Sequence, residues 1–144
     1  MRQPLEVLVF VRRGAEVLVA HRSPPFGSYW HAIAGGVELG ETEREAAVRE
    51  LREETGLDVG DDLVALEHRF AYSLDEDPPE RRALFAAGTT HVEVECFVAV
   101  VPAGWEPELN AEHDGYRWCS ADEARELLRW DDVKDALGRV DFGR

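Results

Sequence analysis

The segment GGVELGETEREAAVRELREETGL, residues 35–57, decides most of what can be inferred about the fold. Thr42 is followed three residues later by Glu45, the spacing of a capping box, in which side chains bond the free N–H groups at the start of a helix. Gly56 stands directly after the last residue of the apolar period, where a glycine commonly ends a helix. These signals predict a helix over residues 43–55.

The same segment places three carboxylates on one side of the predicted helix. At about 100° per residue, Glu50, Glu53 and Glu54 share an arc of about 100° next to the apolar stripe. We expect them at the edge of the buried face, where charges ~5 Å apart repel by roughly 3 kcal/mol at an effective dielectric of about 20. A divalent cation with oxygen ligands would remove this repulsion. The alternative is an acidic helix face that stays in water.

Strand-like segments lie on both sides of this helix. The stretch EVLVFVRRGAEVLVAHR reads as two apolar strands joined at Arg13 and Gly14, and alternation with β-branched residues marks two later ones. YRW indicates a short last strand. The strands are therefore predicted within residues 6–22, 63–74, 91–101 and 116–118.

Two late helices complete the predicted pattern. Ser120 with Glu123 repeats the capping box, and a short helix is expected near residues 132–137. Residues 75–88, DEDPPERRALFAAG, read as a loop or a flap. Strands first and last, with one early helix and late helices, predict an α/β fold whose mixed sheet is covered on both faces.

Length and composition indicate one ordinary globular unit. With 144 residues, 44% hydrophobic and 32% charged, the chain is expected to form a single domain over residues 1–144. No apolar run approaches the roughly 18 residues of a membrane span, and no signal peptide is evident, so a cytoplasmic protein without a membrane partner is expected. Cys96 and Cys119, two cysteines without secretory features, are interpreted as packing thiols.

The net negative charge of the chain limits the kinds of molecule that it is expected to bind. Thirty acidic against sixteen basic residues give a net charge of −14, which argues against binding a nucleic acid polymer through its phosphates. A small phosphorylated substrate would need the help of a cation.

Nine residues of the segment 35–57 fill every fixed position of the Nudix box, G-x5-E-x7-R-E-U-x-E-E-x-G-U: Gly35, Glu41, Arg49, Glu50, Leu51, Glu53, Glu54, Gly56 and Leu57. The chain therefore resembles the Nudix hydrolases, and its length, strand order and late helix are similar to theirs as well. The resemblance implies an α/β/α sandwich with a central mixed β-sheet. It also implies an enzyme that hydrolyses a nucleoside diphosphate linked to another group.

The resemblance further implies a metal site formed by three box glutamates, with Mg²⁺ or Mn²⁺ held by Glu50, Glu53 and Glu54. The carbonyl near Ala34 or Gly35 is a further candidate ligand. Arg49 would orient Glu53 through an i,i+4 pair, and Glu41 would lie behind the ligands. The metals would neutralise the pyrophosphate oxygens and lower the pKa of the attacking water.

The carboxylate that accepts the proton of this water stays open among Glu50, Glu53 and Glu112. Glu112 begins EHDGYRW, residues 112–118, which resembles the segment that brings a loop glutamate to the metals in dihydroneopterin triphosphate and diadenosine polyphosphate hydrolases. The alternative is a surface acid. His113 is interpreted as a loop hydrogen-bonding residue in preference to a ligand.

Three residues are candidates for substrate binding. Arg22, at the end of LVAHR, would meet a substrate phosphate or form a surface ion pair. Trp30 precedes the box as an aromatic residue does in this family, and core packing competes with base stacking there. Tyr72 lies near, but slightly short of, the place where dinucleoside polyphosphate hydrolases carry a tyrosine.

Two segments, AIAGGVE and ALFAAGTTHVEVECFVAV, resemble dihydroneopterin triphosphate pyrophosphatases. ADP-ribose hydrolases usually have a proline at about the position of Ala71 and Tyr72. This chain lacks it, so hydrolysis of ADP-ribose is placed below the other candidate activities. The leading hypothesis is a metal-dependent pyrophosphohydrolase of a nucleoside or pterin triphosphate, or a related nucleoside diphosphate-X substrate, acting as a monomer or homodimer. The alternatives are a dinucleoside polyphosphate hydrolase, a catalytically silent nucleotide-binding module and a structural divalent-ion binder.

Overall fold

The computed structural model describes residues 2–143. Its longest helix, α1 (Glu43–Thr55), begins at the predicted capping box: the Glu45 amide donates to Thr42 Oγ1 at 3.1 Å, and the Thr42 amide donates to Glu45 Oε1 at 2.9 Å. Gly56 follows the helix with a φ of 77°, in the left-handed region that glycine adopts without steric cost. The predicted helix over residues 43–55 is confirmed.

A seven-stranded mixed sheet forms the centre of the structure. Five strands are arranged in the order β3-β2-β1-β6-β5, while β4 pairs with β1 and β7 pairs with β2. The pair β1–β6 is parallel, and the other pairs are antiparallel. The strands are β1 (Leu5–Arg13), β2 (Glu16–Arg22), β3 (Trp30–His31), β4 (Ile33–Gly36), β5 (Leu63–Ser73), β6 (His91–Val100) and β7 (His113–Cys119).

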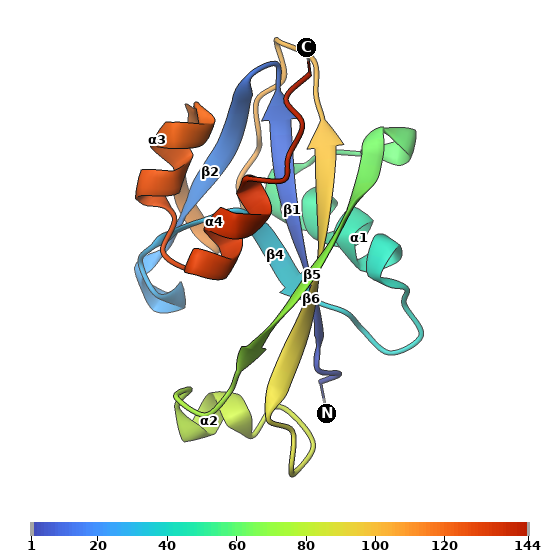
Figure 1. The fold of residues 1–144 in the computed structure, drawn as a ribbon, viewed down its shortest axis with the longest axis vertical. Helices are drawn as coiled ribbons and strands as arrows, with labels where there is room; N and C mark the ends of the chain where they lie inside the picture. The colour runs from blue at the N-terminus through green and yellow to red at the C-terminus, as the bar shows by residue number, and fades with distance from the viewer. Residues whose placement is uncertain (1, 144) are drawn as a thin grey trace.

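Helices cover the sheet on both faces, as predicted (Figure 1). Alternate residues of β1 divide between two buried clusters: Val7 and Val9 pack with α1, and Leu8 and Phe10 pack with the late helices. These are α3 (Ala121–Leu127), which starts at the second predicted capping box, and α4 (Asp131–Leu137). The shorter turns are η1 (Pro24–Phe26), η2 (Gly60–Asp62) and α2 (Pro79–Arg82).

Two short strands and one short helix were missed by the sequence analysis. Strand β3 has only two residues and β4 has four, so neither is long enough to show an alternating pattern, and their pairing with β2 and β1 decides their conformation. Helix α2 lies within the segment predicted to be a loop or flap. Strand β4 matters for function because it carries Gly35 to the side of α1.

Among residues 2–143, no helix combines the length and the apolar character needed to cross a membrane. Cys96 and Cys119 are both free and both fully buried, as expected for packing thiols.

Candidate active site

Helix α1 directs two of the three clustered glutamates into the protein. The side chain of Glu54 is 1% exposed and that of Glu50 is 12% exposed, whereas the side chain of Glu53 is 54% exposed. The expectation that all three lie at the edge of the buried face is therefore wrong for Glu54. It lies within that face, beside Leu51 and Thr55, because α1 packs against both β1 and β4.

Gly35 on β4 allows the Glu50 carboxylate to lie against the sheet. A Cβ atom at this position would be 2.2 Å from Oε1 of Glu50, closer than any real contact. Because the backbone of Gly35 is held by its pairing with Val7 in β1, a larger residue here would force the Glu50 carboxylate into another position. The first fixed residue of the segment thus forms one wall of a cradle for a carboxylate.

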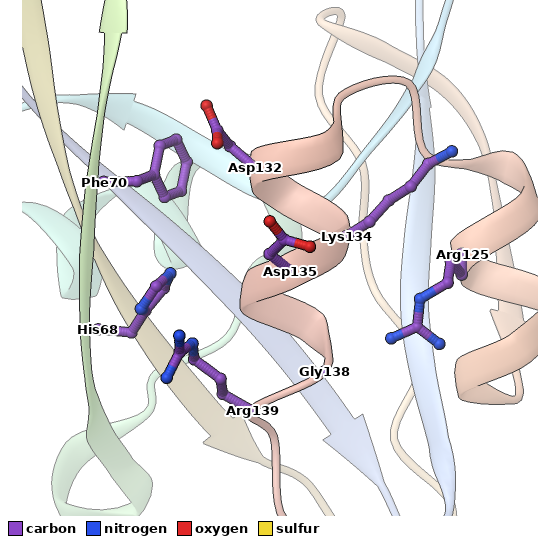
Figure 2. Close-up of a pocket in the computed structure, with 8 residues that line it drawn as sticks. All are labelled: His68, Phe70, Arg125, Asp132, Lys134, Asp135, Gly138 and Arg139. Atoms are coloured by element: carbon purple, nitrogen blue, oxygen red, sulfur yellow. The ribbon is translucent and has the colours of Figure 1, made fainter.

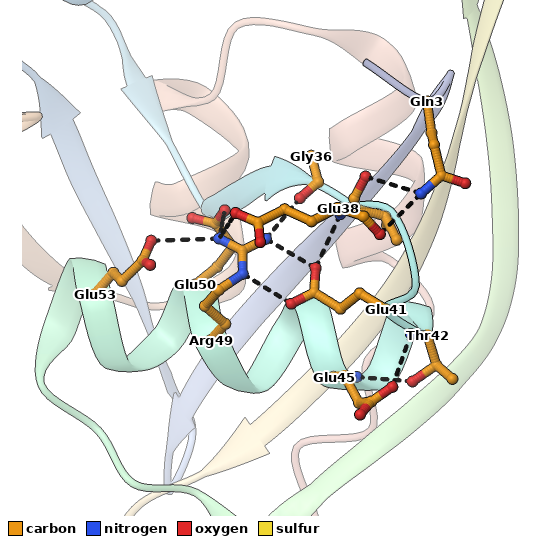
Figure 3. A network of polar contacts seen from close by, with 10 residues as sticks. Gln3, Gly36, Glu38, Glu41, Thr42, Glu45, Arg49, Glu50 and Glu53 are labelled. Atoms are coloured by element: carbon orange, nitrogen blue, oxygen red, sulfur yellow. Dashed lines mark hydrogen bonds and ion pairs between the residues drawn. The ribbon is translucent and has the colours of Figure 1, made fainter. Parts of the chain in front are cut away.

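Arg49 connects the acidic residues on the solvent side of this cradle (Figure 3). Its Nε and Nη2 atoms donate to the two carboxylate oxygens of Glu41 at 2.8 and 3.0 Å, and Nη2 also donates to the Gly36 carbonyl at 2.8 Å. Nη1 donates to Glu50 Oε1 at 2.8 Å and to Glu53 Oε2 at 3.4 Å. The bidentate contact lowers the pKa of Glu41, so its charge holds the guanidinium in place.

The pKa values of the two buried glutamates, Glu50 and Glu54, are raised above the ordinary value of 4.5. Burial, together with the neighbouring Glu50 carboxyl group, raises the pKa of Glu54 from 4.5 to about 10. Burial also raises the pKa of Glu50, although Arg49 partly opposes this. Neither carboxylate oxygen of Glu54 has a hydrogen-bond partner within the described chain. Two unsatisfied buried oxygens on one carboxyl group are costly unless a further group binds them.

These features fit a divalent cation bound by oxygen ligands. The Glu54 oxygens without hydrogen-bond partners and the Glu50 carboxylate, which lies in the space left by Gly35, are hard oxygen donors of the kind that Mg²⁺ prefers. Within residues 2–143, no three His, Cys, Asp or Glu side chains are yet gathered closely enough to hold an ion. Arg49 occupies one oxygen each of Glu50 and Glu53, so these two carboxylates would have to turn toward a bound cation.

A loop before β7 carries Glu112 to the same region. The side chain of Asn110 donates to the Glu53 carbonyl at the end of α1 at 3.0 Å and accepts from the Glu112 amide at 3.0 Å. The Ser23 amide donates to the Glu112 carbonyl at 2.8 Å. The next residue, His113, has its Nε2 3.8 Å from Glu54 Oε1, and the negative charge of Glu112 adds to the raised pKa of Glu54. Glu112, which the sequence analysis proposed as a distant member of the site, therefore lies close to the glutamates of α1.

Arg22, at the end of β2, stands between the acidic residues and a group of aromatic rings. Its Nη1 lies 4.0 Å from Glu112 Oε2, and its guanidinium lies over the rings of Phe26 and Tyr29, at 5.6 and 5.8 Å from their centroids. The side chain is 17% exposed. Its position is suited to contact a phosphate that approaches the carboxylates.

A family model described as the NUDIX domain matches residues 2–138. The chain belongs to the NUDIX family. The resemblance found in residues 35–57 is thereby confirmed, and with it the α/β sandwich and membership of a family of hydrolases acting on phosphoanhydride bonds. The complete Nudix box of this chain runs from the end of β4 through the following loop and α1 to Leu57.

Curated and structural relatives agree with this assignment. A dihydroneopterin triphosphate diphosphatase of Haemophilus influenzae is 28% identical over 140 residues, which are 97% of this chain and 87% of that protein. The structure of the Escherichia coli dihydroneopterin triphosphate pyrophosphohydrolase is 26% identical, covers 96% of this chain and 94% of its own, and superposes with a TM-score of 0.80.

A third relative is much longer than this chain. An octanoyltransferase of Myxococcus xanthus is 35% identical over 138 residues, which are 94% of this chain but only 36% of that protein. This NUDIX chain thus spans about a third of that relative. The name of the longer protein describes a chain of which most has no counterpart here.

An aromatic group beside the Nudix site was missed by the sequence analysis. Trp130, at the start of α4, is 43% exposed, and its ring lies 4.8 Å from that of Tyr29 and 5.5 Å from that of His31. Arg129 lies over the rings of both Tyr29 and Trp130. Tyr29 and His31 are 98 or more positions from Arg129 and Trp130 in the chain, so no local pattern could have joined the two pairs.

Two of the predicted substrate residues have other partners in this NUDIX fold. Trp30 is half-buried against the cluster under α3 and α4, and its ring meets His21 edge-on, which supports the packing role. Tyr72 donates its hydroxyl hydrogen to Glu6 Oε1 at 2.7 Å and accepts a hydrogen bond from Arg81. Its hydroxyl is therefore held within the protein, although its ring stays partly exposed.

Two cavities differ in their relation to the Nudix box. One of about 390 Å³ is lined by Arg49 and Glu50 and opens beside the candidate metal ligands. The other, of about 370 Å³, lies between β5 and α4, where His68 and Phe70 face Asp132 and Asp135 of the helix and Arg139, which follows it (Figure 2). No residue of the Nudix box lines the second cavity, so it lies outside the candidate active site.

His31 makes the NUDIX fold sensitive to acid. Burial, together with the positive charge of Arg22, lowers the pKa of His31 from 6.5 to about 3. The unfolded chain then binds the proton more readily, so the contribution of His31 to stability is present above pH 6.5 and is lost as the pH falls toward 3. The slope has an upper bound of about 1.4 kcal/mol per pH unit.

We therefore expect His31→Gln, which cannot gain this charge, to lose less thermal stability than the wild type between pH 6.5 and pH 4. Melting temperatures measured by circular dichroism across this range test the expectation. His91→Gln, a substitution at an exposed histidine of β6, is the matched control and should follow the wild type. Parallel curves for His31→Gln and the wild type would show that this ring is not responsible.

Proposed function

We propose that this NUDIX protein is a divalent-metal-dependent pyrophosphohydrolase of a small nucleoside or pterin triphosphate. One observation carries the proposal: Glu54, buried beside Glu50, presents two carboxylate oxygens that accept no hydrogen bond from a donor in the described chain. A module that only binds nucleotides, without catalysis, does not need a buried carboxyl group that reduces the stability of the fold. This chain also keeps every fixed residue of the Nudix box.

Glu50 and Glu54 are the proposed inner ligands, with Glu53 and Glu112 reaching the ion from the rim and a carbonyl near Gly35 as a further donor. Mg²⁺ is the proposed ion because the donors are carboxylate oxygens, and Mn²⁺ accepts the same set. When bound, the ion supplies charge that neutralises the phosphate oxygens and acidifies the attacking water. Arg49 sets the orientation of Glu50 and Glu53 through its hydrogen bonds.

Glu112 is the proposed general base. No shared hydrogen bond with Arg49 restrains its carboxylate, and the fixed backbone of the 110–112 loop holds it near Glu54. It would accept the proton of the water that attacks phosphorus, while Arg22 binds the phosphate group on the other side. Glu50 and Glu53 remain the alternatives, but Arg49 already donates to both of them.

The proposed substrate is a small molecule with a planar base. The relatives that act on dihydroneopterin triphosphate match nearly the whole chain, and Tyr29 and Trp130 present aromatic surface next to Arg22. The net charge of −14 disfavours a nucleic acid polymer. A dinucleoside polyphosphate is the second candidate, favoured by the partly exposed ring of Tyr72. We further propose that residues 1–144 act as one domain, as a monomer or a homodimer.

A substrate panel tests this proposal. Dihydroneopterin triphosphate, the common nucleoside triphosphates, diadenosine tetraphosphate and ADP-ribose would each be incubated with the protein and Mg²⁺, and the released products would be identified by chromatography. We expect the highest kcat/KM for a triphosphate, with pyrophosphate as a product. Faster cleavage of diadenosine tetraphosphate would favour the second candidate, and binding without cleavage of any compound would indicate a silent module.

Trp130→Ala tests the role of the aromatic surface. Loss of one stacking ring costs about 1–3 kcal/mol, so we expect KM for the best triphosphate to rise by about tenfold with little change in kcat. Inorganic tripolyphosphate, which has no base, is the control substrate and should be processed equally by both proteins. The same change in KM for tripolyphosphate would mean that Trp130 acts on the fold or on the phosphates.

A further inference from the structure

His113 and Glu54 form a buried polar pair that the mechanism above does not use. The side chain of His113 is 0% exposed, and its Nε2 lies 3.8 Å from Oε1 of Glu54, which is 1% exposed. Both ring nitrogens of His113 and both oxygens of Glu54 lack a hydrogen-bond partner within residues 2–143. Four unsatisfied buried atoms on two neighbouring side chains require an explanation.

The backbone fixes the position of this imidazole. His113 is the first residue of β7, where it pairs with Arg22 of β2, and its amide donates to the Asn110 carbonyl at 3.3 Å. Asn110 is in turn hydrogen-bonded to the end of α1 at the Glu53 carbonyl. The ring therefore approaches Glu54 from β7, whereas Gly35 and β4 lie beside Glu50.

The gap between the two groups is slightly too long for a hydrogen bond. A separation of 3.8 Å would close to about 2.8 Å if the flexible Glu54 side chain moved by about 1 Å. A neutral imidazole has one N–H to donate, and a carboxylate that binds a metal through one oxygen has a second oxygen free to accept. Carboxylates and histidines that bind metals are commonly held by such hydrogen bonds from behind.

We propose that His113 is a positioning residue: its Nε2–H donates to Oε1 of Glu54 when a divalent cation is bound, so that Oε2 is directed at the cation. This inference rests on the proposed function, because it assumes that Glu54 is a metal ligand. It assigns a role to a residue that the sequence analysis treated as a loop hydrogen-bonding residue.

The test measures Mn²⁺ affinity directly, by the loss of the free-ion electron paramagnetic resonance signal on titration. Loss of a supporting hydrogen bond typically weakens metal binding by about 10- to 100-fold, and we expect this for His113→Asn, whose amide is too short to reach Glu54. His113→Gln, whose amide nitrogen reaches about as far as Nε2, should retain affinity within about threefold of the wild type. Because both variants are polar amides, a general loss of packing would affect them alike.

Two further measurements complete the test. Melting of the metal-free variants by circular dichroism identifies any that do not fold, and His113→Leu provides a third variant that cannot donate at all and should bind as weakly as His113→Asn. His91→Gln, at an exposed histidine of β6, is the control and should bind as the wild type does. At saturating metal, the weak variants should recover KM but keep a lowered kcat, because Glu54 is then bound but poorly directed.

The outcomes separate this inference from the proposed function. If the wild type binds Mn²⁺ and hydrolyses substrate while Asn, Gln and Leu at position 113 all bind equally tightly, only the role of His113 is overturned. A ¹⁴N coupling from His113 in the pulsed spectrum of bound Mn²⁺ would also overturn it, since the ring would then be a direct ligand. If the wild type binds no Mn²⁺, the proposed function fails and the role of His113 fails with it.

Discussion

Glu54→Gln should lower kcat by about a thousandfold or more while the protein still folds. The substitution keeps the shape of the side chain but removes the negative charge that makes it a strong cation ligand, and metal neutralisation of the phosphates supplies several kcal/mol. Initial rates measured with the best substrate of the panel over a range of Mg²⁺ concentrations test this. Glu126→Gln, at an exposed glutamate of α3, is the matched control and should leave the rate unchanged.

The same variant has an expected effect on stability. Because the pKa of Glu54 is raised from 4.5 to about 10, the folded protein holds this proton longer than the unfolded chain does. The stability that Glu54 contributes is therefore present below pH 4.5 and is lost as the pH rises toward 10. Metal-free Glu54→Gln should thus lose less stability than the wild type between pH 5 and pH 9.

In the kinetic experiment, near-normal turnover of Glu54→Gln at saturating Mg²⁺ would refute the role of Glu54 as a metal ligand.

Glu112→Gln should lower kcat by about 100-fold or more and change KM by less than about twofold. General base catalysis contributes about 10²- to 10⁴-fold, and an interaction made chiefly in the transition state appears in kcat. Its side chain is 39% exposed and the loop is held by backbone contacts to Ser23, so the substitution should not disturb the fold. Steady-state kinetics with the best substrate of the panel measure both parameters.

Glu108→Gln is the control for this experiment. Glu108 precedes the same loop and is exposed, its amide donates to the Thr55 carbonyl at 2.8 Å, and its side chain lies next to Gly56. We expect it to be almost silent. Small and equal effects at positions 108 and 112 would show Glu112 to be a surface acid, and the base would then be Glu50 or Glu53.

Local signals in the sequence predicted the elements that depend on local physics. The capping boxes at Thr42 and Ser120 and the glycine at position 56 set the ends of helices through contacts between residues at most four positions apart, and the structure shows them. The candidate site residues were proposed from the resemblance to the Nudix box, whose spacing places Glu50 and Glu54 one helical turn apart. Such features do not require knowledge of the tertiary fold.

The remaining features depend on contacts between distant segments. The angular position of Glu54 on α1 could not reveal that its side chain would be only 1% exposed, next to the first residue of β7. Tyr29 and Trp130 meet only because η1 and α4 lie on the same side of the sheet. His113 stands next to Glu112 in the sequence, yet its approach to Glu54 is set by the pairing of β7 with β2.

The most direct measurement is a ³¹P nuclear magnetic resonance time course of the triphosphate substrate with the wild-type protein, first with Mg²⁺, then with excess EDTA, then with Mg²⁺ restored. If Glu50 and Glu54 hold a catalytic divalent cation, phosphoanhydride cleavage should proceed, stop on chelation and resume on addition of the ion. Cleavage that continues unchanged in EDTA, or no cleavage of any panel substrate with either Mg²⁺ or Mn²⁺, would contradict a metal-dependent NUDIX pyrophosphohydrolase.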